Sequence, residues 1–341
     1  MLRSLLKTGG LILVGAFIAG ESLEGQAPTV TVGGVGYLSY VYQLKDTANQ
    51  LNTFDVARSY VNVLGTFAYG VKTRITSDIY RVADGSLALR LKYGFVSWTP
   101  EKSALTFKMG MTQTPLVDWE EALWEYRMQG NIALDRNGYL TSSDIGVAVD
   151  GSWGFDRVSA SAGLYNGESY NKAPGDKRKD VAARVSVRVK GTDEPGRVGG
   201  LRLTGFAHYG TPTTGGKRQR FAGIVSYRSK ALTLAAELAA TKDSVTAPVT
   251  ALRNGRLITT FGVYKIPSSK FAVIGRLDLL DPNTKVDEDR QTRIIAGVSY
   301  TMSSNLRVLL DLDHLSYQAG STTPALEAVR SQALFQVQFT F

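Results

Sequence analysis

The chain of 341 residues has no cysteine, two histidines and ten prolines. The absence of cysteine excludes disulfides, thiolate metal sites and a cysteine nucleophile. No stretch after the first 27 residues reaches the roughly 20 apolar residues that a transmembrane helix needs, so a helical membrane protein is excluded. Glycine (35), tyrosine (16) and phenylalanine (13) are plentiful by contrast. This composition is typical of a large sheet that has many aromatic side chains to place.

The two histidines do not indicate a catalytic site. Chemistry of the Ser-His-acid type needs a histidine beside both a nucleophile and a carboxylate. Asp313 directly precedes His314 in an expected strand, which puts the two side chains on opposite faces, and nothing marks a nucleophile near His208. The turn at 281–284 and the acidic residues 287–289 offer oxygen ligands for Ca²⁺, but a solvated turn is the simpler interpretation. We predict no enzyme activity, no metal and no cofactor.

Residues 1–27 have the pattern of an export signal. Basic residues precede a short apolar run at 11–19, and a polar segment follows it,. The run is too short to span a bilayer. We expect cleavage between Gly20 and Pro28, which leaves residues 28–341 as the mature protein; a buried first helix is the alternative.

The formal net charge of +9 restricts the partners. Nucleic-acid binding calls for clustered basic runs, and this chain has none. An exported protein is also a poor match for a nucleic-acid partner. A positively charged lumen, or an affinity for acidic surface sugars, fits the basic excess better.

The final segment, 331–341, is the basis of the fold prediction. Successive strand side chains point to opposite faces, and only Leu334 interrupts an otherwise amide and hydroxyl face. A strand of this kind that ends on phenylalanine resembles the last strand of bacterial outer-membrane β-barrels, which carries the signal read by the barrel-assembly machinery. The candidate signal residues are Phe335, Val337, Phe339 and Phe341.

Alternating segments of about ten residues continue from Thr29 onward, the pattern of an antiparallel transmembrane β-barrel. We predict an all-β fold of about 16 strands, an even number that brings both ends to one side. A long loop is expected at 242–255. The expected strands are 29–44, 53–69, 71–81, 87–95, 105–111, 144–153, 157–166, 181–190, 201–209, 221–228, 232–241, 256–266, 271–280, 292–302, 306–317 and 331–341.

The hairpin at 87–111 predicts one apolar face and one basic face. Its apolar face is expected to run through Leu91 and then Tyr93 and Phe95, while Lys92 and Lys108 lie on the other face. Aromatic residues near strand ends are typical of the girdles at the two membrane interfaces. We assign Tyr93, Trp98, Trp153, Tyr227 and Tyr300 to these girdles, with sugar stacking in the lumen as the alternative.

The segment 114–141 is the longest that interrupts the strand pattern. Leu116, Trp119, Leu123 and Tyr126 recur at helical spacing, and Pro115 occupies a plausible first helical position,. We predict a partly helical loop that folds into the lumen and constricts it; the alternative is an external loop on the rim. The candidate constriction residues are Asp118, Trp119, Glu120, Glu121, Trp124 and Glu125.

Four stretches resemble the phosphate-selective porin O and P family. Residues 106–115, TFKMGMTQTP, are similar to its strand that ends in a Gly, Gln and Pro pattern before an inward loop. Residues 144–147, 163–167 and 278–300 resemble later family segments in order and spacing. The resemblance implies a sixteen-stranded channel for small solutes in the bacterial outer membrane, often trimeric.

The chain departs from that family in its basic residues. The resemblance would imply a dense lysine ladder and arginine cluster, but here the expected inward cations are scattered, so phosphate specificity is not predicted. The acidic residues of the loop would also oppose anions. The candidate anion-contacting residues are Arg90, Lys92, Lys108, Arg127, Arg136, Arg184, Arg188, Arg202 and Arg293. The alternative is that they pair with Asp78, Glu237, Asp278, Asp311 and Asp313.

The sequence therefore predicts an outer-membrane porin that passes small anionic or neutral solutes by diffusion, with a modest anion preference. Its expected surroundings are outer-membrane lipid and lipopolysaccharide, and a homotrimer is compatible with the apolar outer face. Two other hypotheses are a plugged barrel with a structural or adhesive role and an outer-membrane hydrolase that uses His208 or His314.

Overall fold

The computed structural model describes residues 27–341 except 174, 213–214, 246–250 and 319–322. The expected export signal, apart from Ala27, lies outside the described residues.

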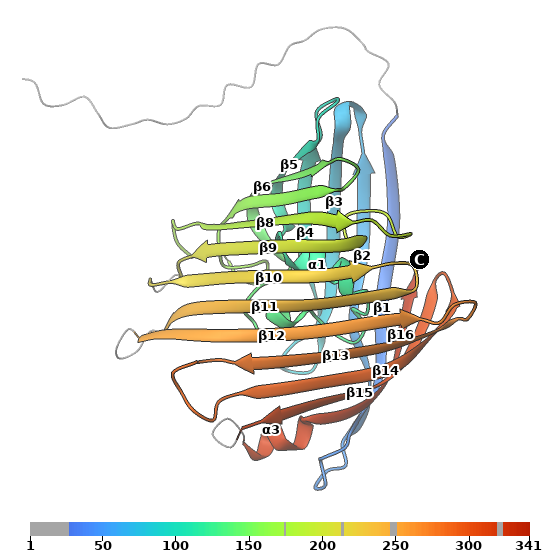
Figure 1. Cartoon of the computed structure of the whole chain (residues 1–341), viewed down its shortest axis with the longest axis vertical. Coiled ribbons are helices and arrows are strands. Elements are labelled where there is room, and N and C mark those ends of the chain that lie inside the picture. Colours follow the sequence, from blue (N-terminus) through green and yellow to red (C-terminus); the bar gives the residue numbers. More distant parts are fainter. Residues whose placement is uncertain (1–26, 174, 213–214, 246–250, 319–322) are drawn as a thin grey trace, which may run out of the picture.

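Sixteen strands form one closed barrel, as predicted (Figure 1). Each strand is antiparallel to its neighbours, and Val35 of the first strand lies opposite Thr340 of the last. The strands are β1 (Thr29–Gln43), β2 (Asn52–Thr66), β3 (Val71–Arg81), β4 (Leu87–Trp98), β5 (Leu105–Gln113), β6 (Ser143–Trp153), β7 (Val158–Tyr165), β8 (Asp180–Lys190), β9 (Gly200–Gly210), β10 (Arg218–Arg228), β11 (Leu232–Val245), β12 (Ala251–Lys265), β13 (Phe271–Asp281), β14 (Gln291–Ser303), β15 (Leu306–Tyr317) and β16 (Ser331–Thr340).

Four short helices accompany the strands among the described residues. A 3-10 helix, η1 (Ala68–Gly70), joins β2 to β3, and α3 (Pro324–Val329) precedes β16. Helices α1 (Val117–Trp124) and α2 (Ala133–Arg136) belong to the segment between β5 and β6. None of the helices in the described part of the chain is long and apolar enough to cross a membrane.

Alternation decides which side chains face the lumen. In β8 the valines Val181, Val185 and Val189 are exposed on the outer face, whereas Arg184 and Ser186 are buried on the inner face. Because an apolar outer band suits contact with lipid, the strand pattern confirms the predicted barrel architecture.

The seam between β1 and β16 explains two glycines. A Cβ atom at Gly36 would overlap the ring of Phe339, and one at Gly34 would overlap the ring of Phe341. The Gly34 amide also donates to the Phe341 carbonyl at 2.9 Å. Glycine therefore lets aromatic rings of the final segment lie flat on β1, while Leu334, the exception in the pattern, is buried on the inner face.

The prediction for the apolar face of the hairpin at 87–111 is wrong after Leu91. Lys92 and Tyr93 are consecutive yet both buried, and the register between β3 and β4 shifts at this level. A β-bulge inserts one residue and exchanges the two faces. Tyr93 consequently lies in the lumen under Arg74, 4.4 Å from its guanidinium, and is not a girdle residue, while Trp98 is exposed on the outer face.

The predicted long loop at 242–255 is also wrong. Lys242 pairs with Asn254 and Thr241 with Gly255, so β11 and β12 extend well past the expected ends. Backbone hydrogen bonds continue the hairpin although its side chains are polar there. Polar residues predict a loop here, but backbone pairing keeps them in the two strands.

Candidate functional site: the lumen loop and the wall opposite

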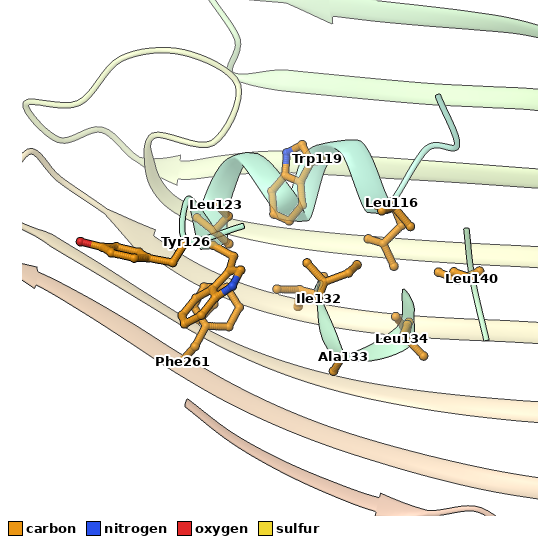
Figure 2. Packing of buried hydrophobic residues seen from close by; sticks show 14 of the residues in the cluster. Leu116, Trp119, Leu123, Tyr126, Ile132, Ala133, Leu134, Leu140 and Phe261 are labelled. Atoms are coloured by element: carbon orange, nitrogen blue, oxygen red, sulfur yellow. The ribbon is translucent and has the colours of Figure 1, made fainter. Parts of the chain in front are cut away.

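The segment 114–141 folds into the barrel, as predicted. Figure 2 shows labelled side chains of α1 and α2 gathered with Phe261 of β12 in one apolar cluster over the inner wall. Trp119, Leu123 and Trp124 have no exposed surface, and the ring centroids of Trp124 and Phe261 are 5.2 Å apart. The core of this protein therefore lies in the lumen, between the loop and an apolar stretch of the inner wall.

The helix in this loop is shorter than predicted. It begins at Val117, two residues after Pro115, and ends at Trp124 because Glu125 adopts a left-handed conformation with φ of 38°. Tyr126 therefore lies beyond the helix, and its hydroxyl is 2.6 Å from the Ser299 hydroxyl on β14. The helical spacing predicted the buried face but not its end.

Cations of the barrel wall hold the end of α1. Arg228 donates to the Glu125 carboxylate at 3.0 Å, and the ammonium of Lys265 lies 2.8 Å from the same group. Arg307 donates to the backbone carbonyl of Glu125 at 3.3 Å. These three residues come from β10, β12 and β15, so one loop carboxylate and its carbonyl link the loop to widely separated parts of the wall.

The start of α1 is held by the turn between β8 and β9. The indole N–H of Trp119 donates to the Arg197 carbonyl at 3.1 Å, and the Arg197 guanidinium pairs with Asp118. Asp118 and Glu125, two of the predicted acidic constriction residues, thus both form ion pairs with arginines.

A basic wall lies on β2, β3 and β4. We use this name for Arg58, Arg74, Arg90 and Lys92. Arg58 and Arg74 were missed from the sequence, although Arg74 alternates with Thr76 and Asp78 on the inner face of β3. Counting polar residues on the inward positions of β3 would have found it.

The loop contacts Tyr60 of β2, which lies beside the basic wall. The Arg127 guanidinium donates to the Tyr60 hydroxyl at 3.4 Å and lies 2.6 Å from the Glu121 carboxylate. The Lys92 ammonium donates to the same hydroxyl at 3.2 Å. Glu121 is thus the predicted acidic residue that faces the basic wall, and the loop spans the lumen at this level.

Two cations of the basic wall have no carboxylate partner among the described residues. Arg74 donates to Asn62 at 3.0 Å and to Thr76 at 2.9 Å, and Lys92 donates to Tyr60. Neutral oxygens accept their hydrogen bonds, so neither cation forms an ion pair in the described structure, although the Glu121 carboxylate acts on Lys92 from farther away. A lumen whose cations lack close carboxylate partners attracts anions.

The nine predicted basic residues divide into two groups. Five form ion pairs: Arg90 with Asp78, Lys108 with Asp150, Arg127 with Glu121, and both Arg136 and Arg293 with Asp313. The remaining four have neutral partners in the described structure. The pairing alternative therefore holds for part of the set.

Arg184, Arg188 and Arg202 bind neutral oxygens near the loop and the turns. Arg184 donates to the Pro115 carbonyl at 3.0 Å, and Arg188 to the Phe155 carbonyl at 2.7 Å. Arg202 is fully buried and donates to the carbonyl of Gly199 at 2.9 Å. The expectation that Arg202 contacts solutes is wrong, because backbone carbonyls of the turn occupy its donors.

Glu120 does not face the passage, contrary to the prediction. It is 1% exposed, and its carboxyl lies beside that of Glu237 on β11. Burial, with the neighbouring Glu237 charge, raises the pKa of Glu120 well above its usual range. The Arg276 guanidinium, which pairs with Asp278 at 2.8 Å, offsets part of this rise in the pKa of Glu120. Protonation of Glu120 relieves its repulsion with Glu237.

We expect the stability of the folded protein to fall with rising pH because of Glu120. The unfolded chain has an ordinary glutamate pKa near ~4.3, whereas the folded pKa is raised, so the contribution is complete below the unfolded value and is lost as pH rises through the folded value. Thermal unfolding of the native protein and of Glu120→Gln, measured across pH, checks this. The variant should show a shallower decline, and equal slopes would contradict the assignment.

The histidines are placed without a catalytic triad. His208 lies 2.8 Å from the Asp180 carboxylate, which Arg218 also binds at 2.7 Å. The ring nitrogens of His314 lie 2.6 Å from the Ser331 hydroxyl and 2.8 Å from the Ser316 hydroxyl. The serine beside His314 was not predicted, but both ring nitrogens contact hydroxyls, and none of the carboxylates in the described part of the chain forms an ion pair with the ring.

Comparison with known proteins gives a structural likeness only. No family model and no curated protein matches the sequence. The structure matches an anion-selective porin from Comamonas acidovorans, with a TM-score of 0.67 and 14% identity, over 92% of this chain and 100% of that chain. It matches Salmonella typhi OmpF, in complex with daunomycin, with a TM-score of 0.66 and 11% identity, over 92% and 97% of the two chains.

A third match is the trimer form of OmpT, an outer membrane protein of Vibrio cholerae, with a TM-score of 0.64 and 13% identity, over 93% of this chain and 100% of that chain. The matched structures named here do not include a phosphate-selective porin. The architecture agrees with the predicted outer-membrane location. The chain therefore has the sixteen-stranded barrel fold of bacterial outer-membrane porins.

Proposed function

We propose that this protein is an outer-membrane porin through which small hydrophilic solutes diffuse, with a modest preference for anions. The observation that supports this most directly is the basic wall, where Arg74 and Lys92 face the loop without carboxylate partners in the described structure. Phosphate specificity is not part of the proposal, because the cations do not form a continuous ladder. The protein acts without catalysis, cofactor or metal.

The proposed partners follow from the outer face. Its exposed valines and aromatic residues meet outer-membrane lipid and lipopolysaccharide, and a homotrimer would bury part of the same surface. The strand with Phe335, Val337, Phe339 and Phe341 is the proposed signal for the barrel-assembly machinery. Residues 1–27 are the proposed export signal.

The test is the current through a planar bilayer that holds the purified mature protein under a salt gradient. We expect stepwise conductance and a zero-current potential whose sign reports faster passage of anions, because the cations of the basic wall raise the local anion concentration. A potential of the opposite sign would show that the acidic loop residues govern the lumen and would overturn the anion preference.

A plugged barrel with a structural or adhesive role is the second candidate. The contact of Arg127 with Tyr60 favours it, since the loop, whose Glu125 binds cations of β10 and β12, also reaches β2. Circular dichroism that reports folded strands, together with the absence of conductance steps, would support this role over diffusion.

A further inference from the structure

A second loop also reaches the basic wall. Tyr170 lies between β7 and β8, and its hydroxyl accepts hydrogen bonds from Arg58 at 3.0 Å and from Arg90 at 2.9 Å. Ser169 before it has φ of 73°, a left-handed conformation that a serine rarely adopts,. The Tyr170 amide donates to the Ser143 carbonyl at 3.2 Å. The backbone thus turns sharply to place this one phenol in the lumen.

The phenol oxygen occupies a position that suits an anion. Two guanidinium groups converge on it, and burial raises the pKa of Tyr170, so the phenol stays neutral. An oxyanion in this position would accept the same two hydrogen bonds and would add the attraction between opposite charges, which the neutral phenol lacks. Asp78 is the single carboxylate that pairs with both Arg58 and Arg90, which leaves one positive charge in excess.

The two guanidinium groups keep their positions without Tyr170. Arg58 binds Asp78 through two nitrogens, at 2.8 and 2.7 Å, and Arg90 binds it at 2.9 Å. The Arg90 guanidinium also stacks on the Tyr80 ring, 3.7 Å from its centroid. The Tyr170 ring also contacts the Arg90 guanidinium, with a centroid distance of 4.5 Å.

We propose that Tyr170 is a displaceable stopper that sets specificity for oxyanions. A passing oxyanion takes the place of the phenol oxygen between Arg58 and Arg90, and Tyr170 returns when the solute leaves. The inference rests on the proposed diffusion function. The neighbouring loop base stays in place, since the Gly167 amide donates to Asp144 at 2.9 Å and Arg218 donates to the Gly167 carbonyl at 2.6 Å.

The test compares single-channel recordings of the native protein, Tyr170→Phe and Tyr165→Phe, in potassium chloride and in potassium acetate of equal ionic strength. Tyr170→Phe keeps the ring but removes the oxygen. Tyr165→Phe is the matched control, because its hydroxyl donates to the Gln113 carbonyl at 3.1 Å, not to the basic wall. Circular dichroism establishes that all three are folded.

We expect Tyr170→Phe to raise the ratio of open to stopped time about tenfold, since a hydrogen bond to a charged group contributes ~1.5–3 kcal/mol. Acetate should raise this ratio in the native protein and in Tyr165→Phe but not in Tyr170→Phe. A ratio of open to stopped time that is the same in Tyr170→Phe and in the native protein would overturn the proposed role of Tyr170. It would leave the diffusion function intact. No conductance from any folded variant would overturn both.

Discussion

Deletion of residues 119–128 is expected to raise single-channel conductance severalfold. Trp119 and Trp124 of this segment are buried in the lumen. Arg127 contacts Tyr60 of β2, beside the basic wall. Its removal opens the cross-section at the level where the loop spans the barrel. Recordings in symmetrical salt, beside those of the native protein, measure the effect.

The deletion removes packing as well as an obstacle, so a milder variant is needed. Trp124→Ala keeps the chain length but leaves a cavity beside Phe261, and truncation of a buried tryptophan costs about 3–5 kcal/mol. We expect noisier current and a lower unfolding temperature, because the loop loses its main apolar anchor. Unchanged conductance in the folded deletion variant would place segment 119–128 away from the solute path.

Charge removal at the basic wall is expected to shift the zero-current potential toward cations. Arg74→Glu combined with Lys92→Gln replaces two cations that have no carboxylate partner in the described structure. The change acts on a narrow, partly buried passage where the field of a charge is weakly screened. The measurement is the zero-current potential under the same salt gradient as for the native protein.

A matched control carries the same change in net charge away from the lumen. Lys102 is exposed in the turn after β4, and Lys230 is exposed in the turn after β10. Lys102→Glu combined with Lys230→Gln should leave the potential near its native value. If both double variants shift it equally, net charge and not the basic wall determines selectivity.

The strands were predictable because their signal is local. Apolar and polar residues alternate along β8 and the terminal strand. This alternation predicted the strand number, and its interruption at 114–141 marked the loop that enters the lumen. The bulge at Lys92 and Tyr93 was not predictable in this way, because one inserted residue exchanges the faces without disturbing composition. The orientation of everything after it in β4 consequently changed.

The candidate site was less predictable, because the role of each basic residue depends on which groups its side chain contacts. Inward position alone made Arg90 and Arg202 equivalent candidates, yet one pairs with Asp78 and the other is buried against turn carbonyls. Tyr170 and Arg58 are separated by 112 positions in sequence. Contacts of this range depend on which loops enter the lumen, and alternation within single strands carries no information about that.

The ring-on-glycine seam between β1 and β16 has a consequence for biosynthesis. Strands adjacent in the finished sheet come from opposite ends of the sequence, so the cylinder cannot close until both have been delivered. A shortened product that lacks β16 would keep two unpaired edges, and unsatisfied backbone groups cost several kcal/mol each in lipid. Insertion of this protein is therefore expected to be all-or-none, with chains that lack β16 failing to form a closed barrel in the membrane.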